Sequence, residues 1–278
     1  MPSFSGKPKQ VFSGLGIGWN KKAGRYQARR DMPELGLKKG AFVKNTRVVS
    51  ALEKYRDITQ KDMKQAAQDL KEKKIGFREF ERGMRRLIRE NERAAAMIGA
   101  GGAQRFNKNK NFERELEQNI RVQFEYLSKY VADMRDKGRD NMTARDINRA
   151  GMYSLTSHKT MYQMMRSALQ NDADDMGMKL CEKRVLGDAE HCPDCVGYAS
   201  ACWQEAGVLP EPTENSQCGA NCRCNKRFTF LPINTDCEDI PCSDDGNAGE
   251  IQQQDKDSNV TDLSDDSRVS ESEDNGSS

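Results

Sequence analysis

The chain has 278 residues, of which 36% are hydrophobic and 32% are charged, and its mean hydropathy is −0.89. This composition favours helices with wide solvated faces over an enzyme with a thick apolar core. No run of about 18 apolar residues occurs, so we expect no membrane-spanning segment. The N-terminal stretch MPSFSGKPKQVF lacks the apolar core of a secretory signal. We therefore expect the chain to be made in a reducing cytoplasm, where thiols usually stay free or bind metal.

The net charge of +2 conceals an uneven distribution. Residues 1–110 contain 27 Lys/Arg and 11 Asp/Glu, a net charge of +16, whereas residues 111–236 contain 16 and 19, a net charge of −3. Residues 237–278 contain 2 and 13, a net charge of −11. The basic front half suits contact with nucleic acid or an acidic protein surface, although solvated helix faces explain the same charges. The predicted contacts are Arg82, Arg85, Arg86 and Arg89.

In chain order, residues 1–45 predict a flexible basic arm, because they are rich in Gly, Lys and Arg and show little periodicity. Residues 46–177 predict a helical region, because apolar residues recur every three or four positions. The three stripes are Val49, Leu52, Tyr55, Met63, Ala66 and Leu70; Phe77, Phe80, Met84, Leu87 and Ile98; and Leu116, Ile120, Phe124, Leu127, Val131 and Met134. The second stripe is interrupted near Gly99.

A fourth helix is predicted to begin at Thr143-Ala-Arg-Asp146, which resembles a capping box with Asp in place of Glu. It continues through methionines to about Met176, and we expect these to be adaptable core residues. Such stripes need partners, so the long helices should pack together.

After Gly177, residues 178–236 predict a small Cys-rich subdomain in which two strand-like runs form a hairpin. Residues 237–278 predict an acidic disordered tail. The expected fold class is therefore mainly α: a bundle of long helices followed by a small Cys-rich subdomain that contains a β-hairpin, with disordered ends.

The stretch EHCPDC, residues 190–195, raises the question of what its two thiols do. The pair resembles a glutaredoxin-like dithiol, but that fold places the pair early in a βαβ layout, whereas here about 140 helical residues precede it. A zinc deaminase needs His-x-Glu before Pro-Cys-x-x-Cys, which is absent.

A metal site draws on a second cluster, Cys218-Gly-Ala-Asn-Cys222-Arg-Cys224. Zinc takes four tetrahedral Cys or His ligands, and a closed set is structural. The predicted ligands are four of Cys192, Cys195, Cys218, Cys222 and Cys224, the fourth being Cys222 or Cys224. His191 is a further candidate ligand, and Cys181 and Cys202 are reserve candidates. Free or disulfide-paired thiols in a small packed knob remain the alternative.

The order of these features resembles the phage head morphogenesis, or minor capsid, proteins of the Mu F type. The residues that carry the resemblance are Cys192-Pro-Asp-Cys195, Trp203, Leu209-Pro210, Ser216, Cys218 and Asn221-Cys222-Arg223-Cys224. The resemblance covers roughly residues 143–230. Many members have His-Pro-Asn before Cys-Arg-Cys, whereas this chain has Gly219-Ala220-Asn221. Cys218 stands beside the missing histidine and could replace it as a ligand.

The resemblance implies a non-enzymatic, low-copy protein of the head interior that docks at the portal vertex during assembly. Its expected partners are the portal protein, capsid or scaffold components, and packaged double-stranded DNA. The alternative is a zinc-stabilised nucleic-acid-binding protein. We find no nucleophile, base and orienting group in one motif and expect no small-molecule substrate.

Overall fold

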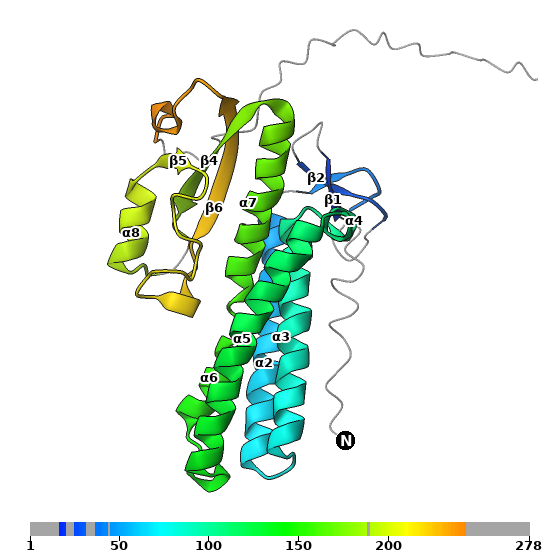
Figure 1. Cartoon of the computed structure of the whole chain (residues 1–278), viewed down its shortest axis with the longest axis vertical. Helices are drawn as coiled ribbons and strands as arrows, with labels where there is room; N and C mark the ends of the chain where they lie inside the picture. Colours follow the sequence, from blue (N-terminus) through cyan, green and yellow to red (C-terminus); the bar gives the residue numbers. More distant parts are fainter. Residues whose placement is uncertain (1–16, 21–24, 32–36, 44, 188–189, 243–278) are drawn as a thin grey trace, which may run out of the picture. The chain divides into compact units, whose positions relative to one another are not determined.

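The computed structural model describes residues 17–20, 25–31, 37–43, 45–187 and 190–242. Most of these residues are helical, and two small sheets accompany the helices (Figure 1). The fold is therefore mainly α with a small β-containing subdomain, as the sequence predicts. Among the described residues, none of the helices combines the length and the apolar character that a membrane crossing requires.

The helical bundle consists of four long helices and two short ones. They are α2 (Asn45–Lys71), α3 (Phe77–Gly99), α4 (Ala103–Lys108), α5 (Lys110–Lys137), α6 (Ala144–Met152) and α7 (Ser157–Met176). Helix α3 contacts α2, α5 and α7, and α2 also contacts α6. Figure 1 shows α2, α3 and α5 running alongside one another.

The predicted apolar stripes form the core of this bundle. Met63, Leu70, Phe80, Leu127 and Val131 belong to one buried cluster that joins α2, α3 and α5. A second cluster joins α3, α4, α5 and α7. The side chains of Val49, Leu52 and Tyr55 lie outside the described residues. In the described residues, the three-to-four-residue period of the stripes therefore predicts correctly which helix faces are buried.

Glycine marks the end of α3 for two physical reasons. A Cβ at Gly99 would lie in contact with the backbone oxygen of Met161, so only glycine allows α3 and α7 to cross this closely. Gly101 and Gly102 follow with φ of 85° and 119°, values that side chains with a Cβ rarely adopt. The interruption predicted from the sequence is therefore the end of the helix.

The capping box predicted at Thr143 is present. The Thr143 side chain accepts a bond from the third helical residue, and the Asp146 Oδ2 accepts from the Thr143 N–H at 2.7 Å. Lys137 Nζ lies 2.6 Å from the same carboxylate oxygen. These donors lower the pKa of Asp146 to about 2, with the Lys137 hydrogen bond as the largest cause. Helix α6 therefore begins here as predicted. The prediction that the same helix continues to Met176 is wrong, because α6 ends at Met152 and a separate helix, α7, begins at Ser157.

The Cys-rich subdomain contains a three-stranded antiparallel sheet in the order β5-β4-β6. Strand β4 (Met178–Val185) pairs along its whole length with β6 (Asn225–Pro232), from Met178 opposite Pro232 to Val185 opposite Asn225. Strand β5 (Trp203–Glu205) adds to the other edge of β4, and helix α8 (Pro193–Ser200) lies between β4 and β5 in the chain. The two predicted strands pair as expected, and the third was not predicted.

A second sheet lies in the range for which the sequence predicts a flexible arm. Strands β1 (Ile17–Asn20), β2 (Arg25–Ala28) and β3 (Phe42–Val43) pair antiparallel in that order. Ala28, Leu37 and Val43 are buried with Ile98 and Met165 of the helical bundle. The arm prediction is wrong for this sheet, because its few apolar residues reach the surface of α3 and α7. The predicted arm residues 1–16 lie outside the described residues.

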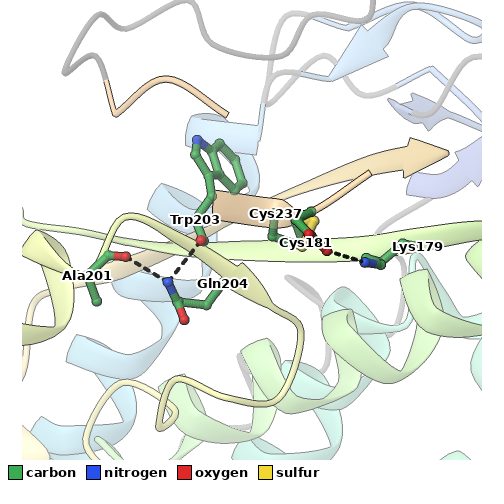
Figure 2. The surroundings of a disulfide bond; sticks show 7 residues. Lys179, Cys181, Ala201, Trp203, Gln204 and Cys237 are labelled. Carbon is green, nitrogen blue, oxygen red and sulfur yellow. Dashed lines mark hydrogen bonds and ion pairs between the residues drawn. A yellow bond between two sulfur atoms is a disulfide. The ribbon is translucent and has the colours of Figure 1, made fainter. Parts of the chain in front are cut away.

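Two disulfides tie the end of the described chain to the sheet. Cys181 of β4 is bonded to Cys237, which begins the short helix η4 (Cys237–Asp239) (Figure 2). Cys202 is bonded to Cys242. The Cα atoms are 5.7 Å and 5.5 Å apart, which is usual for a disulfide. Residues 237–242 thus belong to the fold, whereas the sequence assigns them to the tail. The predicted tail residues 243–278 lie outside the described residues.

Candidate metal centre

The first half of the candidate metal centre is the N-terminus of α8. Cys192 is the residue before the helix, Pro193 is the first helical residue, and Cys195 lies in the first turn. Proline suits this position because its fixed φ matches the helix and it has no N–H to leave unpaired. Asp194 Oδ2 accepts a hydrogen bond from the Gln217 backbone N–H at 2.8 Å, which holds the second half against the first.

The second half is the turn that leads into β6. Cys218 precedes the short helix η3 (Gly219–Asn221), and Cys222 follows it. Gly219 has φ of 49°, a left-handed value that glycine adopts without strain. Gly187 lies close by, because a Cβ there would sit 2.5 Å from the Arg223 backbone oxygen. The turn therefore packs directly against the segment that follows β4.

All five predicted ligands lie in one cluster. The Cys218 Sγ is 3.4 Å from the Cys192 Sγ and 3.3 Å from the Cys195 Sγ, and the Cys195 Sγ is 3.7 Å from the Cys222 Sγ. Two groups of three have ligand atoms within 4.8 Å of one another, Cys192 with Cys195 and Cys218, and Cys195 with Cys222 and Cys224. The cluster could hold a metal ion, and Cys195 belongs to both groups.

The sulfur cluster is closed on one side and half-exposed on the other. Cys195, Cys222 and Cys224 are buried, with exposed fractions of 0%, 2% and 0%, whereas Cys192 and Cys218 are half-buried. These five are the unbonded cysteines of the described residues. Cys181 and Cys202, which the sequence holds in reserve as ligands, are instead in disulfides. The prediction that these two cysteines are reserve ligands is therefore wrong, because each is bonded to another cysteine.

His191 lies at the edge of the cluster with its ring oriented by the backbone. Its Nε2 is 2.7 Å from the Gly187 carbonyl oxygen, and its Nδ1 is 3.7 Å from the Cys224 Sγ. A carbonyl only accepts, so Nε2 carries the proton and the Nδ1 lone pair faces the sulfur. This arrangement is the one in which a histidine can bind metal or accept a thiol proton.

The thiols influence one another's protonation strongly. The Cys224 thiol donates to the Cys222 sulfur, which lowers the pKa of Cys222 to about 4 and raises that of Cys224. The pKa of Cys192 is lowered to about 7, chiefly by a backbone hydrogen bond at Cys195, and burial raises the pKa of Cys195. Thiolate is the form that binds metal, so the cluster already favours negative charge at Cys222.

Helix α7 contacts the segments around the sulfur cluster through polar groups on one face. His158 Nε2 is 2.9 Å from the Cys224 carbonyl oxygen, and the Tyr162 hydroxyl donates to Asn225 Oδ1 at 2.9 Å. Arg166 forms an ion pair with Glu211 at 2.7 Å. Residues 158, 162 and 166 are four apart and share a helix face. His158 is buried, and this burial lowers its pKa to about 4.

A buried ion network lies beside the sulfur cluster and was not predicted. Lys226 Nζ is completely buried and contacts Glu182 Oε2 at 2.8 Å, Glu211 Oε2 at 3.3 Å and the Leu209 carbonyl oxygen at 2.8 Å. Glu182 also accepts from the Leu209 N–H at 2.9 Å. With Arg166, the network contains two positive and two negative groups, so it fixes the loop before the second cysteine cluster without net charge. A single sequence carries no signal that marks these charges as buried.

The four predicted contact arginines lie on α3, away from the cysteines in the chain. Arg82, Arg86 and Arg89 are exposed, and Arg85 is half-buried. Arg85 pairs with Glu81 at 2.8 Å, and Arg85 and Arg89 lie over the Phe124 ring of α5. A groove of about 640 Å³ between α3 and α5 is lined by Arg85, Arg89, Phe124 and both acidic and basic residues of α5.

Comparisons of the chain with protein-family models, with curated proteins and with solved structures return no match. Any function assigned to the chain therefore depends on its own residues.

Proposed function

We propose that this chain is a non-enzymatic minor head protein of a phage. In this proposal it acts in head morphogenesis inside the head, docks at the portal vertex, and contacts the portal and neighbouring capsid or scaffold components. The Cys-rich subdomain is held by a structural zinc ion. The observation that supports this best is the meeting of Cys192-Pro-Asp-Cys195 with Asn221-Cys222-Arg223-Cys224 in one cluster. These are the segments on which the likeness to Mu F type proteins depends.

Zinc is the metal that suits this donor set. Thiolates at about 2.3 Å from a tetrahedral zinc ion are about 3.8 Å from one another, and the Cys192–Cys218, Cys195–Cys218 and Cys195–Cys222 sulfur separations of 3.3 to 3.7 Å come close to that. We propose Cys192, Cys195, Cys218 and Cys222 as the ligands. Cys224 is the spare thiol, hydrogen-bonded to Cys222 and facing His191. A closed set of four protein ligands leaves no position for a substrate.

The dithiol alternative is less favourable on the same distances. A redox pair needs one accessible thiol whose partner is the second cysteine of its own motif. Here Cys192 and Cys195 each lie within 3.4 Å of Cys218, and Cys195 is fully buried. If the chain were an oxidoreductase, the variant Cys192→Ser with Cys195→Ser would lose dithiol activity while keeping its metal content. We expect loss of metal instead.

The zinc site is tested by metal analysis together with thiol counting. Without reductant, the five unbonded cysteines should react in the denatured chain. In the native zinc-loaded protein, Cys224 should be the one unbonded thiol that no metal ion protects from the thiol reagent. Chelation should make the other four reactive. Cys222→Ser should lose zinc and Cys224→Ser should keep it. Equal zinc content in wild type and Cys195→Ser would contradict the site.

Portal docking is tested by co-expression with the portal protein encoded in the same genome. A tagged portal should retain the wild-type chain, and assembled procapsids should contain it at low copy number. The Cys224→Ser variant, which keeps the proposed ligand set, is the matched control for Cys222→Ser. A folded, zinc-loaded chain that the portal fails to retain would contradict the docking role.

The alternative function is a zinc-stabilised nucleic-acid-binding protein outside the head. The arginines of α3 favour it, since they offer a positively charged surface. Portal binding separates the two functions, because DNA binding is compatible with both.

A further inference from the structure

The basic residues of α3 form a single row. Over the 23 residues of this helix the row comprises Arg78, Arg82, Arg85, Arg86, Arg89 and Arg93. With about 100° of rotation per residue, all six fall within a sector of about 100°. The four acidic residues of α3, Glu79, Glu81, Glu90 and Glu92, fall outside that sector. We call this the α3 arginine row.

The row is exposed, and aromatic rings support three of its members. Every arginine in it is exposed except Arg85, which is half-buried and paired with Glu81. Arg85 and Arg89 lie 4.7 Å and 5.4 Å from the centre of the Phe124 ring, and Arg93 lies 5.7 Å from that of Phe106. A guanidinium held over a ring keeps its outward N–H groups available. These side chains thus lose less freedom when they bind a partner.

We propose that the α3 arginine row binds the phosphate backbone of double-stranded nucleic acid. The row is about 22 Å long from Arg78 to Arg93, with an arginine at nearly every turn. Duplex DNA carries about 13 charges over that length of its axis. A straight and evenly spaced row of one sign suits a periodic polyanion better than the irregular charges of a folded protein. Arginine, present here without lysine, is also the side chain that pairs with phosphate through two parallel bonds.

The packing of α3 determines the kind of recognition. In the described part of the chain, α3 contacts α2, α4, α5 and α7, which leaves one face of the helix uncovered. A helix that enters the major groove needs most of its circumference, since the groove is about 12 Å wide and the helix about as thick. The α3 arginine row therefore contacts phosphates from outside the grooves, and the binding is independent of base sequence. The proposal rests on the proposed function only in identifying the nucleic acid as packaged DNA.

The test is the affinity of the full chain for a fluorescent 30-base-pair duplex, measured by anisotropy from 50 to 200 mM salt. Five exposed arginines predict a slope of about −4.5 for log K against log salt, or about 500-fold weaker binding across this range. The triple variant Arg82→Gln, Arg86→Gln, Arg89→Gln should reduce the slope to about −1.8. Two unrelated duplex sequences should bind equally.

Matched variants distinguish this surface from other basic parts of the chain. Arg145→Gln removes an exposed arginine from α6 and should leave the slope unchanged. The triple Lys variant at positions 82, 86 and 89 keeps the charge and should keep most of the slope. A slope that the triple Gln variant leaves at the wild-type value would overturn the proposal. The proposal would also be overturned if the triple Gln variant kept its DNA affinity but no longer bound an acidic protein partner.

The DNA-binding proposal and the portal-docking proposal can fail independently of each other. Absence of DNA binding by a chain that the portal retains would overturn the arginine proposal alone. DNA binding by a chain that the portal does not retain would overturn the docking role alone. Zinc content and helical circular dichroism, measured on every variant, show that the fold is kept.

Discussion

The helical bundle and the Cys-rich subdomain are stabilised in different ways. In the bundle, continuous clusters of Leu, Met, Phe and Tyr side chains are buried between the helices. In the subdomain, the sulfur cluster with its three buried cysteines, two disulfides and a buried ion network around Lys226 accompany a few large apolar side chains such as Leu180, Trp203 and Leu209. Apolar burial is general and non-directional, whereas the subdomain depends on specific partners. The two regions should therefore respond to different treatments.

Metal removal should produce the largest difference between the two regions. Chelation or Cys195→Ser should increase hydrogen exchange from β4 to β6, because in the proposed site the metal ion holds both cysteine segments together. The bundle should keep its exchange protection and its circular dichroism at 222 nm. Exchange measured by mass spectrometry checks this. Simultaneous loss of protection in α3 and α5 would show that the two regions are one cooperative unit.

Lys226→Met should be the most damaging single substitution in the ion network. It leaves the Glu182 and Glu211 carboxylates buried together without their shared cation, at a cost of about 3–5 kcal/mol. Urea unfolding followed by tryptophan fluorescence, to which Trp19 and Trp203 both contribute, measures the loss. The variant that adds Glu182→Gln and Glu211→Gln removes the unpaired charges and should recover part of it. If the triple variant were no more stable than Lys226→Met, the loss would have a packing origin.

Leu127→Ala tests how strongly the bundle depends on apolar burial. Leu127 is completely buried in the cluster between α2, α3 and α5, so the cavity should cost about 2–5 kcal/mol. Val122→Ala, at an exposed position of the same helix, should stay within about 0.5 kcal/mol of wild type. Thermal unfolding with and without chelator measures both. The Leu127→Ala loss should be the same in the two conditions.

Glu92→Gln should have a smaller effect that depends on pH. Glu92 is buried in the bundle, accepts from the Thr156 hydroxyl at 2.6 Å, and has its pKa raised by burial. Below the ordinary carboxyl pKa both folded and unfolded chains hold a neutral Glu92, so the substitution should change little. As pH rises above about 4.3 the unfolded chain ionises first, which destabilises the wild type alone.

At pH 7 the Glu92→Gln variant should therefore be the more stable, because only the wild type must keep a carboxyl group of raised pKa buried. Unfolding measured between pH 4 and pH 8 checks the trend. A difference in stability that does not change with pH would mean that Glu92 titrates normally in the folded chain.

The sequence predicts the bundle well because the helix period records which faces are buried. Leu116, Leu127 and Met134 follow that period and are buried, and the Thr143–Asp146 capping box is present. The sequence also selects the five cysteines that the structure brings together, because two closely spaced groups separated by a short loop can converge.

Contacts between residues distant in the chain were not predictable. Nothing in the sequence favours pairing of Cys181 with Cys237 over metal binding, since the pairing depends on the path after β6. The sheet at residues 17–43 was missed because its strands are short and their burial depends on α3 and α7. Lys226 and Glu182 look like ordinary strand charges, and only the position of the Leu209 loop encloses them.

The spacing of the α7 contacts has a consequence for how this chain can vary. His158, Tyr162 and Arg166 reach the Cys-rich subdomain from consecutive turns of one helix. Adding or deleting one residue between them would rotate the later contacts by about 100° and break their alignment with the earlier one. Related chains should therefore tolerate length changes in the turns on either side of α7 but keep this nine-residue interval constant.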